Sequence, residues 1–332
     1  MNKFFLLILF LTSLARAELS INYASDIQSV TGGIKEGVAV QGNIFLIYNR
    51  KRQNHMWRAS VLGTHGNSPS ELVGDLQTTS NLDIGGINTV KVFELFYEFN
   101  FNKLQVLGGM FDLASEFNVT EPASLFIHSS PGTSAGLASA GKFGTAFNPS
   151  SALSIRVNYN LSNNTYLKTA TTDATPFNPD NPVGTQFTID QDEGYFFIHE
   201  FGFFSENKYK LALGFWHFSK NQEKGYYLNL DYKVSSNFHP FMRYGKVDKD
   251  AQTFESNSVV GFTCLNWGVM YSSVDLSPQV NSSKAEEALE VSFLYERENF
   301  SFTPHLQYIQ NPALSDEDAM VIGLRISSNF SL

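Results

Sequence analysis

The chain has 332 residues with 23 Lys and Arg against 32 Asp and Glu, so it is acidic and a phosphate-rich partner such as a nucleic acid is excluded. Its single cysteine, Cys264, permits no internal disulfide. Aromatic residues are abundant, with 30 Phe and 14 Tyr, but no uninterrupted apolar stretch reaches the roughly eighteen residues that a membrane-spanning helix needs.

Residues 1–17 have the pattern of a secretory signal peptide. Lys3 precedes an apolar run over residues 4–11, and Ala15 and Ala17 form an A-x-A-like cleavage site. We therefore predict export, cleavage after Ala17 and one domain over residues 18–332. Without Lys3 and Arg16 the mature chain has 21 basic against 32 acidic residues, a net charge of −11.

About sixteen segments of the mature chain have the two-residue period of β-strands. In each, apolar and often aromatic side chains occupy one parity and polar side chains the other. Such segments in an even number are typical of a transmembrane β-barrel. The predicted strands are residues 19–30, 37–49, 57–66, 89–99, 104–113, 151–161, 165–172, 194–205, 209–219, 225–235, 238–247, 256–265, 267–276, 287–297, 300–309 and 319–332.

The connections between these strands alternate in length. The short ones are residues 100–103, 162–164, 206–208, 236–237, 265–266 and 297–299, and the long ones between them are 67–88, 114–150, 173–193, 248–255 and 277–286. A membrane barrel has short periplasmic turns on one rim and longer external loops on the other. A soluble β-sandwich, the main alternative, has no reason to sort its loops in this way. The predicted fold is therefore all-β, an antiparallel transmembrane barrel.

The hairpin over residues 89–117 shows how the two faces are assigned. One parity of its first strand holds Phe93, Leu95, Tyr97 and Phe99, and the other holds Val90, Val92, Glu94, Phe96 and Glu98. We expect the aromatic parity to face lipid, because an unpaired charge facing the membrane midplane costs about 2–4 kcal/mol. In its second strand Gly108 and Gly109 blur the alternation and leave the faces open.

The same alternation places a set of charged residues on the wall of a wet lumen. Donors and acceptors of both signs suit a neutral polyhydroxylated solute. The alternative for each residue is that it is an ordinary charge lining water. The predicted wall residues are Arg58, Glu94, Glu98, Arg156, Asp231, Lys233, Arg243, Glu290, Glu296 and Arg325.

Two features depart from simple alternation. His199 and Glu200 are adjacent, so they cannot both face inward unless the strand contains a bulge. Pro240 and Pro304 lie inside predicted strands of a barrel that has no free edge, which predicts bulges near a rim.

The longest connection, residues 114–150, is expected to fold into the barrel. It has few charges, and the apolar residues Leu125, Phe126, Phe143 and Phe147 favour packing against a surface, for which the inside wall is available. We interpret it as a constriction loop, with a plain external loop as the alternative. Its Phe rings are candidates for stacking against the C–H faces of a sugar.

Two short motifs in the chain resemble catalytic or metal-binding patterns. Gly132, Ser134 and Gly136 match G-x-S-x-G, but the sequence predicts neither the strand before nor the helix after that a nucleophile elbow needs. We interpret this match as chance and His128 as a loop hydrogen bonder. Phe203 replaces the second His of H-E-x-x-H after His199, so no metal site and no cofactor are predicted.

Several runs of residues form a recognisable set along the mature chain. They are His65-Gly-Asn-Ser-Pro-Ser-Glu-Leu-Val-Gly-Asp-Leu-Gln77, Ser80-Asn81, Phe93-Glu94-Leu95-Phe96-Tyr97-Glu98, Ser115-Glu116-Phe117, Leu125-Phe126, Ser129-Ser130, Phe241-Met242-Arg243-Tyr244-Gly245, Gln307-Tyr308-Ile309 and Asn311-Pro312. Together these runs resemble the carbohydrate-selective porin family typified by OprB. The resemblance covers most of the mature chain in the right order and is strongest over residues 19–147.

The resemblance implies a sixteen-stranded outer-membrane barrel that passes monosaccharides and similar small solutes by facilitated diffusion. It also implies that residues 73–84 bend toward the pore and that residues 114–150 form the constriction. The candidates in these two segments are Asp75, Asn81, Glu116, Phe117, Phe126, Phe143 and Phe147.

The expected partners are sugars as permeants, outer-membrane lipid and the barrel-assembly machinery, with either a monomer or a homotrimer as the assembly. The acidic balance leaves a general or cation-preferring porin as an alternative function. Alternatives of other classes are a barrel-embedded serine hydrolase that uses Ser134 and a non-conducting structural barrel.

Overall fold

The computed structural model describes residues 17–142, 144–176, 184, 185, 187, 189, 192–205, 208–220, 222–248, 253–280 and 284–332. Residues 1–16 of the predicted signal peptide (residues 1–17) and the candidate Phe143 lie outside the described residues. Within the described part, no helix has the length and apolar character needed to cross a membrane.

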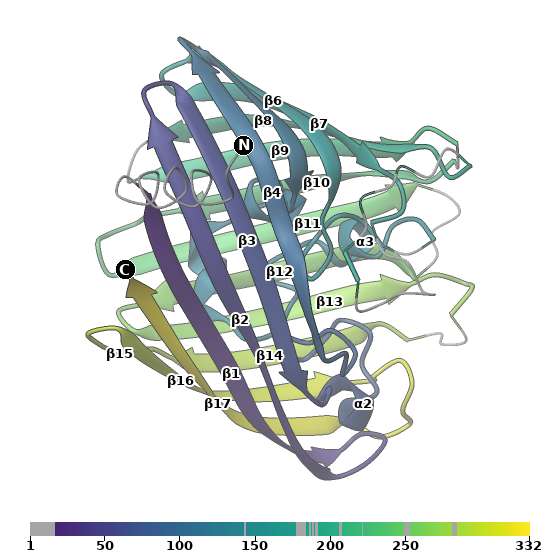
Figure 1. Cartoon of the computed structure of the whole chain (residues 1–332). Coiled ribbons are helices and arrows are strands. Elements are labelled where there is room, and N and C mark those ends of the chain that lie inside the picture. The colour runs from purple at the N-terminus through teal and green to yellow at the C-terminus, as the bar shows by residue number, and fades with distance from the viewer. Residues whose placement is uncertain are drawn as a thin grey trace.

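All the strands belong to one closed antiparallel sheet. Each pairs with its neighbours in the sequence, and β17 pairs with β1 to close the barrel (Figure 1). The strands are β1 (Glu18–Gly32), β2 (Gly37–Arg52), β3 (His55–Gly66), β4 (Thr89–Phe101), β5 (Leu104–Phe111), β6 (Ala152–Ser162), β7 (Thr165–Asp173), β8 (Tyr195–Ser205), β9 (Tyr209–Phe218), β10 (Lys224–Tyr232), β11 (Phe238–Asp248), β12 (Phe254–Cys264), β13 (Trp267–Leu276), β14 (Glu286–Phe293), β15 (Tyr295–Arg297), β16 (Phe300–Gln310) and β17 (Ala319–Ser331).

β14 and β15 are two parts of one barrel strand, so the sixteen-stranded prediction is confirmed. Both pair with β16, through Ser292 with His305 and Tyr295 with Phe302, in an unchanged register. Pro304 lies opposite the interruption. Because proline has no N–H to donate, the ladder is interrupted there without a bulge. The bulge predicted at Pro304 was therefore wrong.

Pro240 is also accommodated without a bulge. It pairs in regular register with Phe262 of β12, while the pairing of β11 with β10 begins only at Phe241. The proline therefore lies just outside the ladder with β10, where its missing N–H removes no hydrogen bond from a paired residue.

The alternation of inner and outer side chains follows the sequence pattern. On β2, Ala39, Gln41 and Asn43 are buried, whereas Val38 and Ile44 are exposed on the outer surface. The inner face of the barrel is thus polar at many positions, and its outer face is apolar, as a surface in contact with lipid requires.

The assignment of faces in β4 was wrong at its external end. The register of β3 with β4 shifts at Phe93, because Ser60 pairs with Glu94 and the next residue, Val61, pairs with Val92. This bulge turns Phe93 inward, where it is 4% exposed, and leaves Val90 on the outer surface at 78%. Beyond the bulge the predicted faces hold, with Leu95 exposed outside and Glu94 buried inside.

β8 contains no bulge, so only one of the adjacent residues His199 and Glu200 faces inward, as the alternation requires. Both strand pairs of β8 keep their register, and Glu200 is completely buried inside. His199 therefore lies on the outer face, where Thr169 Oγ1 is 2.8 Å from its Nδ1. A polar group on the outer face is tolerated here because it has a hydrogen-bond partner on the neighbouring strand.

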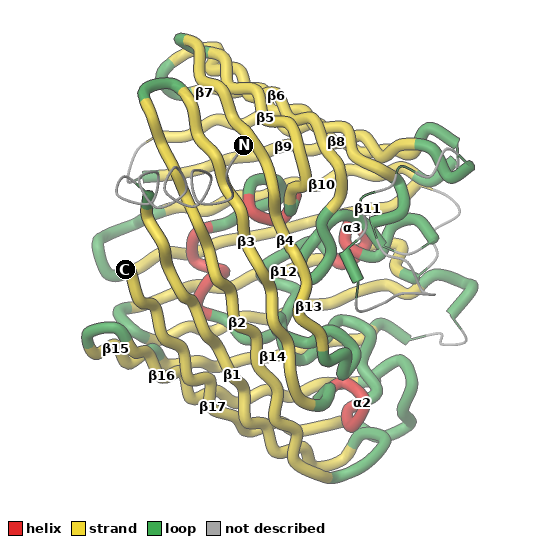
Figure 2. The backbone as a smooth tube through the Cα atoms, viewed as in Figure 1, coloured by secondary structure: helices red, strands yellow, loops and turns green. Residues whose placement is uncertain are grey.

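The longest connections lie on the rim opposite Glu18, where β1 begins, and Ser331, where β17 ends, and they fold partly into the barrel (Figure 1). Figure 2 shows the helical segments of the second of these loops within the barrel. We call residues 67–88 the first inner loop and residues 112–151 the second inner loop. The first contains α2 (Ser70–Val73), and the second contains η1 (Leu113–Ser115), η2 (Glu121–Leu125) and α3 (Ala135–Ala138).

Several glycines of the inner wall make room for aromatic rings. The ring of Tyr227, which is 1% exposed, lies where a side chain on Gly214 would be, because a Cβ added there would lie 2.0 Å from the ring. Tyr166 lies in the same way over Gly202. Gly108, by contrast, is on the outer face with open space beside it.

We therefore expect Gly214→Ala to destabilise the barrel by about 1–3 kcal/mol, because the buried Tyr227 ring must shift. The measurement is the thermal loss of β-sheet circular dichroism in detergent. Gly108→Ala is the matched control and should leave the transition unchanged. Equal transitions for the two variants would contradict the close packing at Gly214.

Candidate functional site: the constriction inside the barrel

The first inner loop is fixed to the wall by the carboxylate of Glu286, at the start of β14. Glu286 Oε1 accepts the N–H of Gln77 at 2.8 Å, and its Oε2 accepts that of Leu76 at 3.0 Å. From β16, the amide of Gln307 donates to the carbonyl of Thr79 at 3.0 Å. The tip of this loop therefore reaches into the lumen, as residues 73–84 were expected to do.

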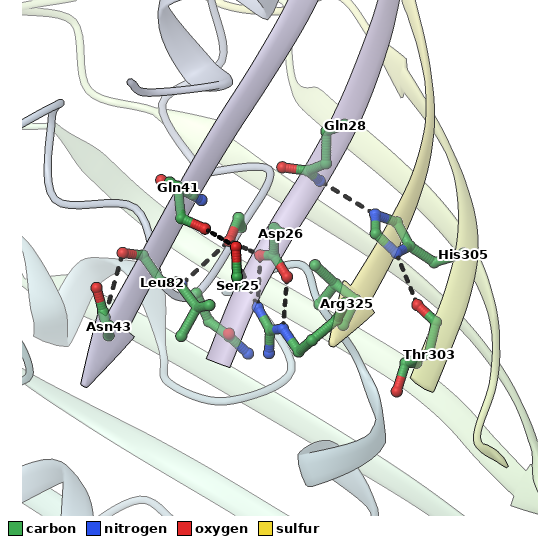
Figure 3. A network of polar contacts seen from close by, with 12 residues as sticks. Ser25, Asp26, Gln28, Gln41, Asn43, Leu82, Thr303, His305 and Arg325 are labelled. Atoms are coloured by element: carbon green, nitrogen blue, oxygen red, sulfur yellow. Dashed lines mark hydrogen bonds and ion pairs between the residues drawn. The ribbon is translucent and has the colours of Figure 1, made fainter. Parts of the chain in front are cut away.

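The seam where the barrel closes carries a bidentate ion pair (Figure 3). Arg325 of β17 donates from Nε and Nη2 to the two carboxylate oxygens of Asp26 on β1, at 2.7 and 2.8 Å. Ser80 of the first inner loop donates to the same carboxylate at 2.5 Å. This one group therefore joins β1, β17 and the loop, and Asp26 is completely buried.

The second inner loop is held by Glu290. This residue lies four positions after Glu286 and also faces inward from β14. Its carboxylate accepts the N–H groups of Ile127 and His128, both at 2.8 Å. Asn81 connects the two inner loops, because its N–H donates to the carbonyl of Ile127 at 2.7 Å and its amide donates to that of Phe126 at 3.0 Å. The loops therefore form one connected structure.

Asn118 is a second attachment point of the same loop. Its N–H donates to Glu200 at 2.9 Å, and its side-chain oxygen accepts from Arg243. Tyr166 and Tyr227 each donate to the Glu200 carboxylate at 2.7 Å. Asn118 has a φ of 60°, a conformation that Asn tolerates better than most residues. All these groups come from the wall strands β7, β8, β10 and β11.

A cluster of charges lies at the beginning of the second inner loop. Arg156 of β6 contacts Glu98 of β4 at 2.5 Å and Glu116 of the loop at 2.6 Å. Lys168 of β7 lies 3.5 Å from Glu116 and 5.3 Å above the ring of Phe117. Arg156 is only 2% exposed, whereas the side chain of Glu116 is 25% exposed. Arg156 therefore supports the loop, and Glu116 faces the remaining space.

Arg58 of β3 and Glu94 of β4 form a further pair on the same part of the wall. Arg58 Nε lies 2.7 Å from Glu94, and the guanidinium side chain is 32% exposed. Ser60 donates to the same carboxylate. Asp231, also on the inner wall, lies 3.6 Å from His239. Of these groups, Arg58 is the most accessible to a solute.

The residues that alternation placed on the inner wall fall into two groups, those covered by a loop and those that remain exposed. Arg156, Arg243 and Glu290 are covered by the second inner loop, so in this structure they bind the chain itself and do not face a solute. The reason is that alternation gives the side of the sheet, whereas access depends on what packs over it. Glu296, at the rim near the termini, is exposed, and Lys233 is partly exposed.

The aromatic candidates are buried, so stacking of Phe126 or Phe147 against a sugar was a wrong expectation. Phe126 is 0% exposed and packs against Phe241 of β11, and Phe147 is 6% exposed in the cluster around Trp216. Phe117 is buried in the same cluster. These rings anchor the loop to the apolar part of the inner wall.

Asp75 and Ser134 have structural contacts. Asp75 is buried in the first inner loop, and burial together with the nearby Glu286 raises its pKa to about 7. Ser134 is buried at the start of α3, a one-turn helix that the sequence did not predict, and donates to Asn257. Burial lowers the pKa of His128 to about 3, and its Nδ1 accepts from Ser130.

Sequence reasoning missed several residues of this site, among them Asp26, Asn118, Glu200 and Glu286. Asp26 and Glu200 have the inward parity of their strands, so alternation could have identified them. Glu286 begins its strand, and Asn118 lies in a loop, where no periodicity applies. Their roles depend on contacts between distant parts of the chain.

Comparison with known proteins agrees with this architecture. The family model described as "Carbohydrate-selective porin, OprB family" matches residues 46–272. The high pH structure of Pseudomonas putida OprB is similar with a TM-score of 0.82 and 14% identity, over 96% of each chain. Its low pH structure gives 0.63 and 11%, over 99% of this chain and 98% of that one.

A mutant of Rh. blastica porin is also similar, with a TM-score of 0.61 and 12% identity over 94% of this chain and 100% of that one. The curated proteins contain no match to the chain. At these identities the structural likenesses show the barrel fold, and the family model adds the family.

We expect Glu290→Ala to free the second inner loop from β14. The N–H groups of Ile127 and His128 would lose their acceptor, and each unpaired group costs about 1–3 kcal/mol. Single-channel recording should then show higher current noise and larger conductance than the unmodified protein. Glu287→Ala, the same change on the outer face of β14, is the control, and identical traces for the two variants would contradict this attachment.

The attachment at Asp112 should depend on pH. Its Oδ1 accepts the N–H groups of Ala114 and Asn148 at 2.9 and 3.2 Å, which joins the two ends of the second inner loop. Burial and the nearby Glu94 raise the pKa of Asp112 from 3.8 to about 8, against the opposing effects of the two N–H hydrogen bonds and of Arg58. Because the pKa is raised on folding, its stabilising contribution is complete below pH 3.8 and is lost as pH rises through about 8.

Current noise should therefore increase between about pH 4 and pH 8, the interval between the unfolded and folded pKa values of Asp112, and change little above pH 8. Asp112→Asn keeps an oxygen that accepts both N–H groups, so its noise should not change over this range. A variant that retains the full pH dependence would show that another group is responsible.

Proposed function

The chain belongs to the OprB family of carbohydrate-selective porins, whose model matches more than half of it, and we propose that it passes monosaccharides and similar small neutral solutes by passive diffusion. Family membership makes it a carbohydrate-selective porin of the outer membrane and a channel, not an enzyme. The size of the permeant and the passive mechanism are the parts that we propose here.

The observation that carries the proposal is that charges at the constriction occur as close pairs. Arg325 is paired with Asp26 and Arg58 with Glu94, each at 2.7 Å, and Arg156 is paired with both Glu98 and Glu116. The field of such pairs falls off quickly, so they favour neither ion strongly. They still offer donors and acceptors to hydroxyl groups.

Passive diffusion is supported by the way in which the loops are attached. Glu286, Glu290 and Glu200 hold the inner loops through direct hydrogen bonds to backbone N–H groups. A narrowing that is fixed to the wall needs no energy input to admit a solute that fits. We propose that Arg58, Glu116 and Arg325, which are partly exposed, contact the permeant. Arg156, Arg243 and Glu290 position the loops.

The remaining partners stay predictions. The outer-membrane lipid follows from the localisation, whereas the barrel-assembly machinery and the choice between monomer and homotrimer come from the sequence interpretation alone. The pairing of acidic with basic residues argues against a cation-preferring porin, although the mature chain is acidic overall.

The test is the swelling of liposomes that contain the folded protein. We expect faster swelling in glucose than in an amino acid of similar size or in a disaccharide, because the constriction offers hydroxyl partners in a fixed space. Equal rates in all three solutes would contradict selectivity for monosaccharides. In a salt gradient the reversal potential should lie near zero, and a large cation potential would support the alternative.

A further inference from the structure

A cavity of about 800 Å³ lies inside the barrel below the constriction, where β1 and β2 meet β16 and β17. Its place follows from the register. Asn22 pairs with Asn329, four residues nearer the chain termini than the Asp26 and Arg325 pair, and Asn299 lies in the short turn before β16. Four strand residues span about 13 Å, so the cavity opens on the periplasmic side of the narrowing.

The lining has the chemistry that a sugar needs. Neutral donors and acceptors predominate, and the apolar side chains of Phe45 and Leu82 complete the wall. Leu82 belongs to the first inner loop, and its carbonyl accepts from Asn43 at 3.4 Å (Figure 3). The polar lining comprises Asn22, Asn43, Asn299, Asn329, Ser301, Ser327, Ser328 and Ser331.

One hydrogen-bond acceptor in this lining has no donor among the described residues. The side-chain oxygen of Asn22 is buried and has no hydrogen-bond partner among the described residues. Buried polar atoms are rarely left without a partner, so a solute or water donor is expected there. The volume also lies within the roughly 300–1,000 Å³ that is typical of small-molecule sites.

The charges of the lining have one sign. Glu296 and Glu298 contribute carboxylates, and the lining contains no Lys or Arg. Carboxylates accept hydrogen bonds from sugar hydroxyl groups, but they repel a sugar acid through its own negative charge. This wall therefore differs from the constriction, where Asp26, Glu94, Glu98 and Glu116 each lie beside an Arg.

We propose that this cavity is a second saccharide subsite on the periplasmic side of the constriction, which accepts neutral or amino sugars and disfavours sugar acids. This inference depends on the passage of sugars proposed above. It adds the place where the sugar binds after it has crossed the constriction. The sugar would donate a hydroxyl to the Asn22 oxygen and contact Asn329 and Glu296.

The test is sugar-induced current block in planar bilayers, with glucose added to one side at a time. Asn22→Leu and Asn329→Leu keep the side-chain volume and remove the hydrogen bonds. We expect each to weaken block from the periplasmic side by about five- to tenfold, the effect of one lost hydrogen bond. Conductance in salt alone should change little, because both residues are neutral.

Asn158→Leu is the matched control. Asn158 of β6 is an inward amide four residues from the end of its strand, a depth similar to that of Asn22, but it lies outside the cavity. Its block should equal that of the unmodified protein. Heat-resistant migration of each variant in detergent gels verifies that the barrel has folded.

The charge prediction uses glucosamine and gluconate in place of glucose. Gluconate should block least, and Glu296→Gln should reduce the difference between the two severalfold. Unchanged block in both Asn variants would overturn the subsite, even if liposome swelling confirms sugar passage. Absence of sugar preference in the unmodified protein would instead contradict the function on which the subsite depends.

Discussion

The narrowing of this barrel depends on carboxylates that extend from the wall into the backbone of the inner loops. Glu200, Glu286 and Glu290 are completely buried, and each accepts N–H groups from loop residues. A buried carboxylate is costly unless its oxygens are satisfied, and a buried loop is costly unless its N–H groups have acceptors. The wall carboxylates accept the loop N–H groups, so both sets of buried polar groups are satisfied and the wall and the loops stabilise one another.

This reciprocal arrangement explains why so many charges are present in a channel for neutral solutes. Arg243 and Arg156 are 0% and 2% exposed, and they bind Asn118 and the two acids Glu98 and Glu116. A large part of the polar inner face is thus used by the protein itself. The residues left for a solute are the partly exposed members of ion pairs, which explains how a strongly charged wall is compatible with a neutral permeant.

The barrel was predictable from the sequence, whereas access to its lumen was not. Alternation such as that of Val38, Ala39 and Val40 is a local property, so it identifies strands and their faces without knowledge of the partners. The inward turn of Phe93 was not predictable, because the bulge follows from the register with β3. The burial of Phe126 likewise depends on docking against Phe241, far away in the sequence.

The same docking determines where a solute can pass. The second inner loop packs against β8 to β13 through Phe147 near Trp216 and through Phe126 near Phe241, so that side of the lumen is filled. The wall of β1 to β3 and of β16 and β17 carries the first inner loop, whose Val73 packs near Val30 and Val321. Arg58 is accessible there, and the 800 Å³ cavity begins below the Asp26 and Arg325 pair. We infer that a solute passes along the seam where β1 meets β17, on the side of the lumen that the second inner loop leaves open.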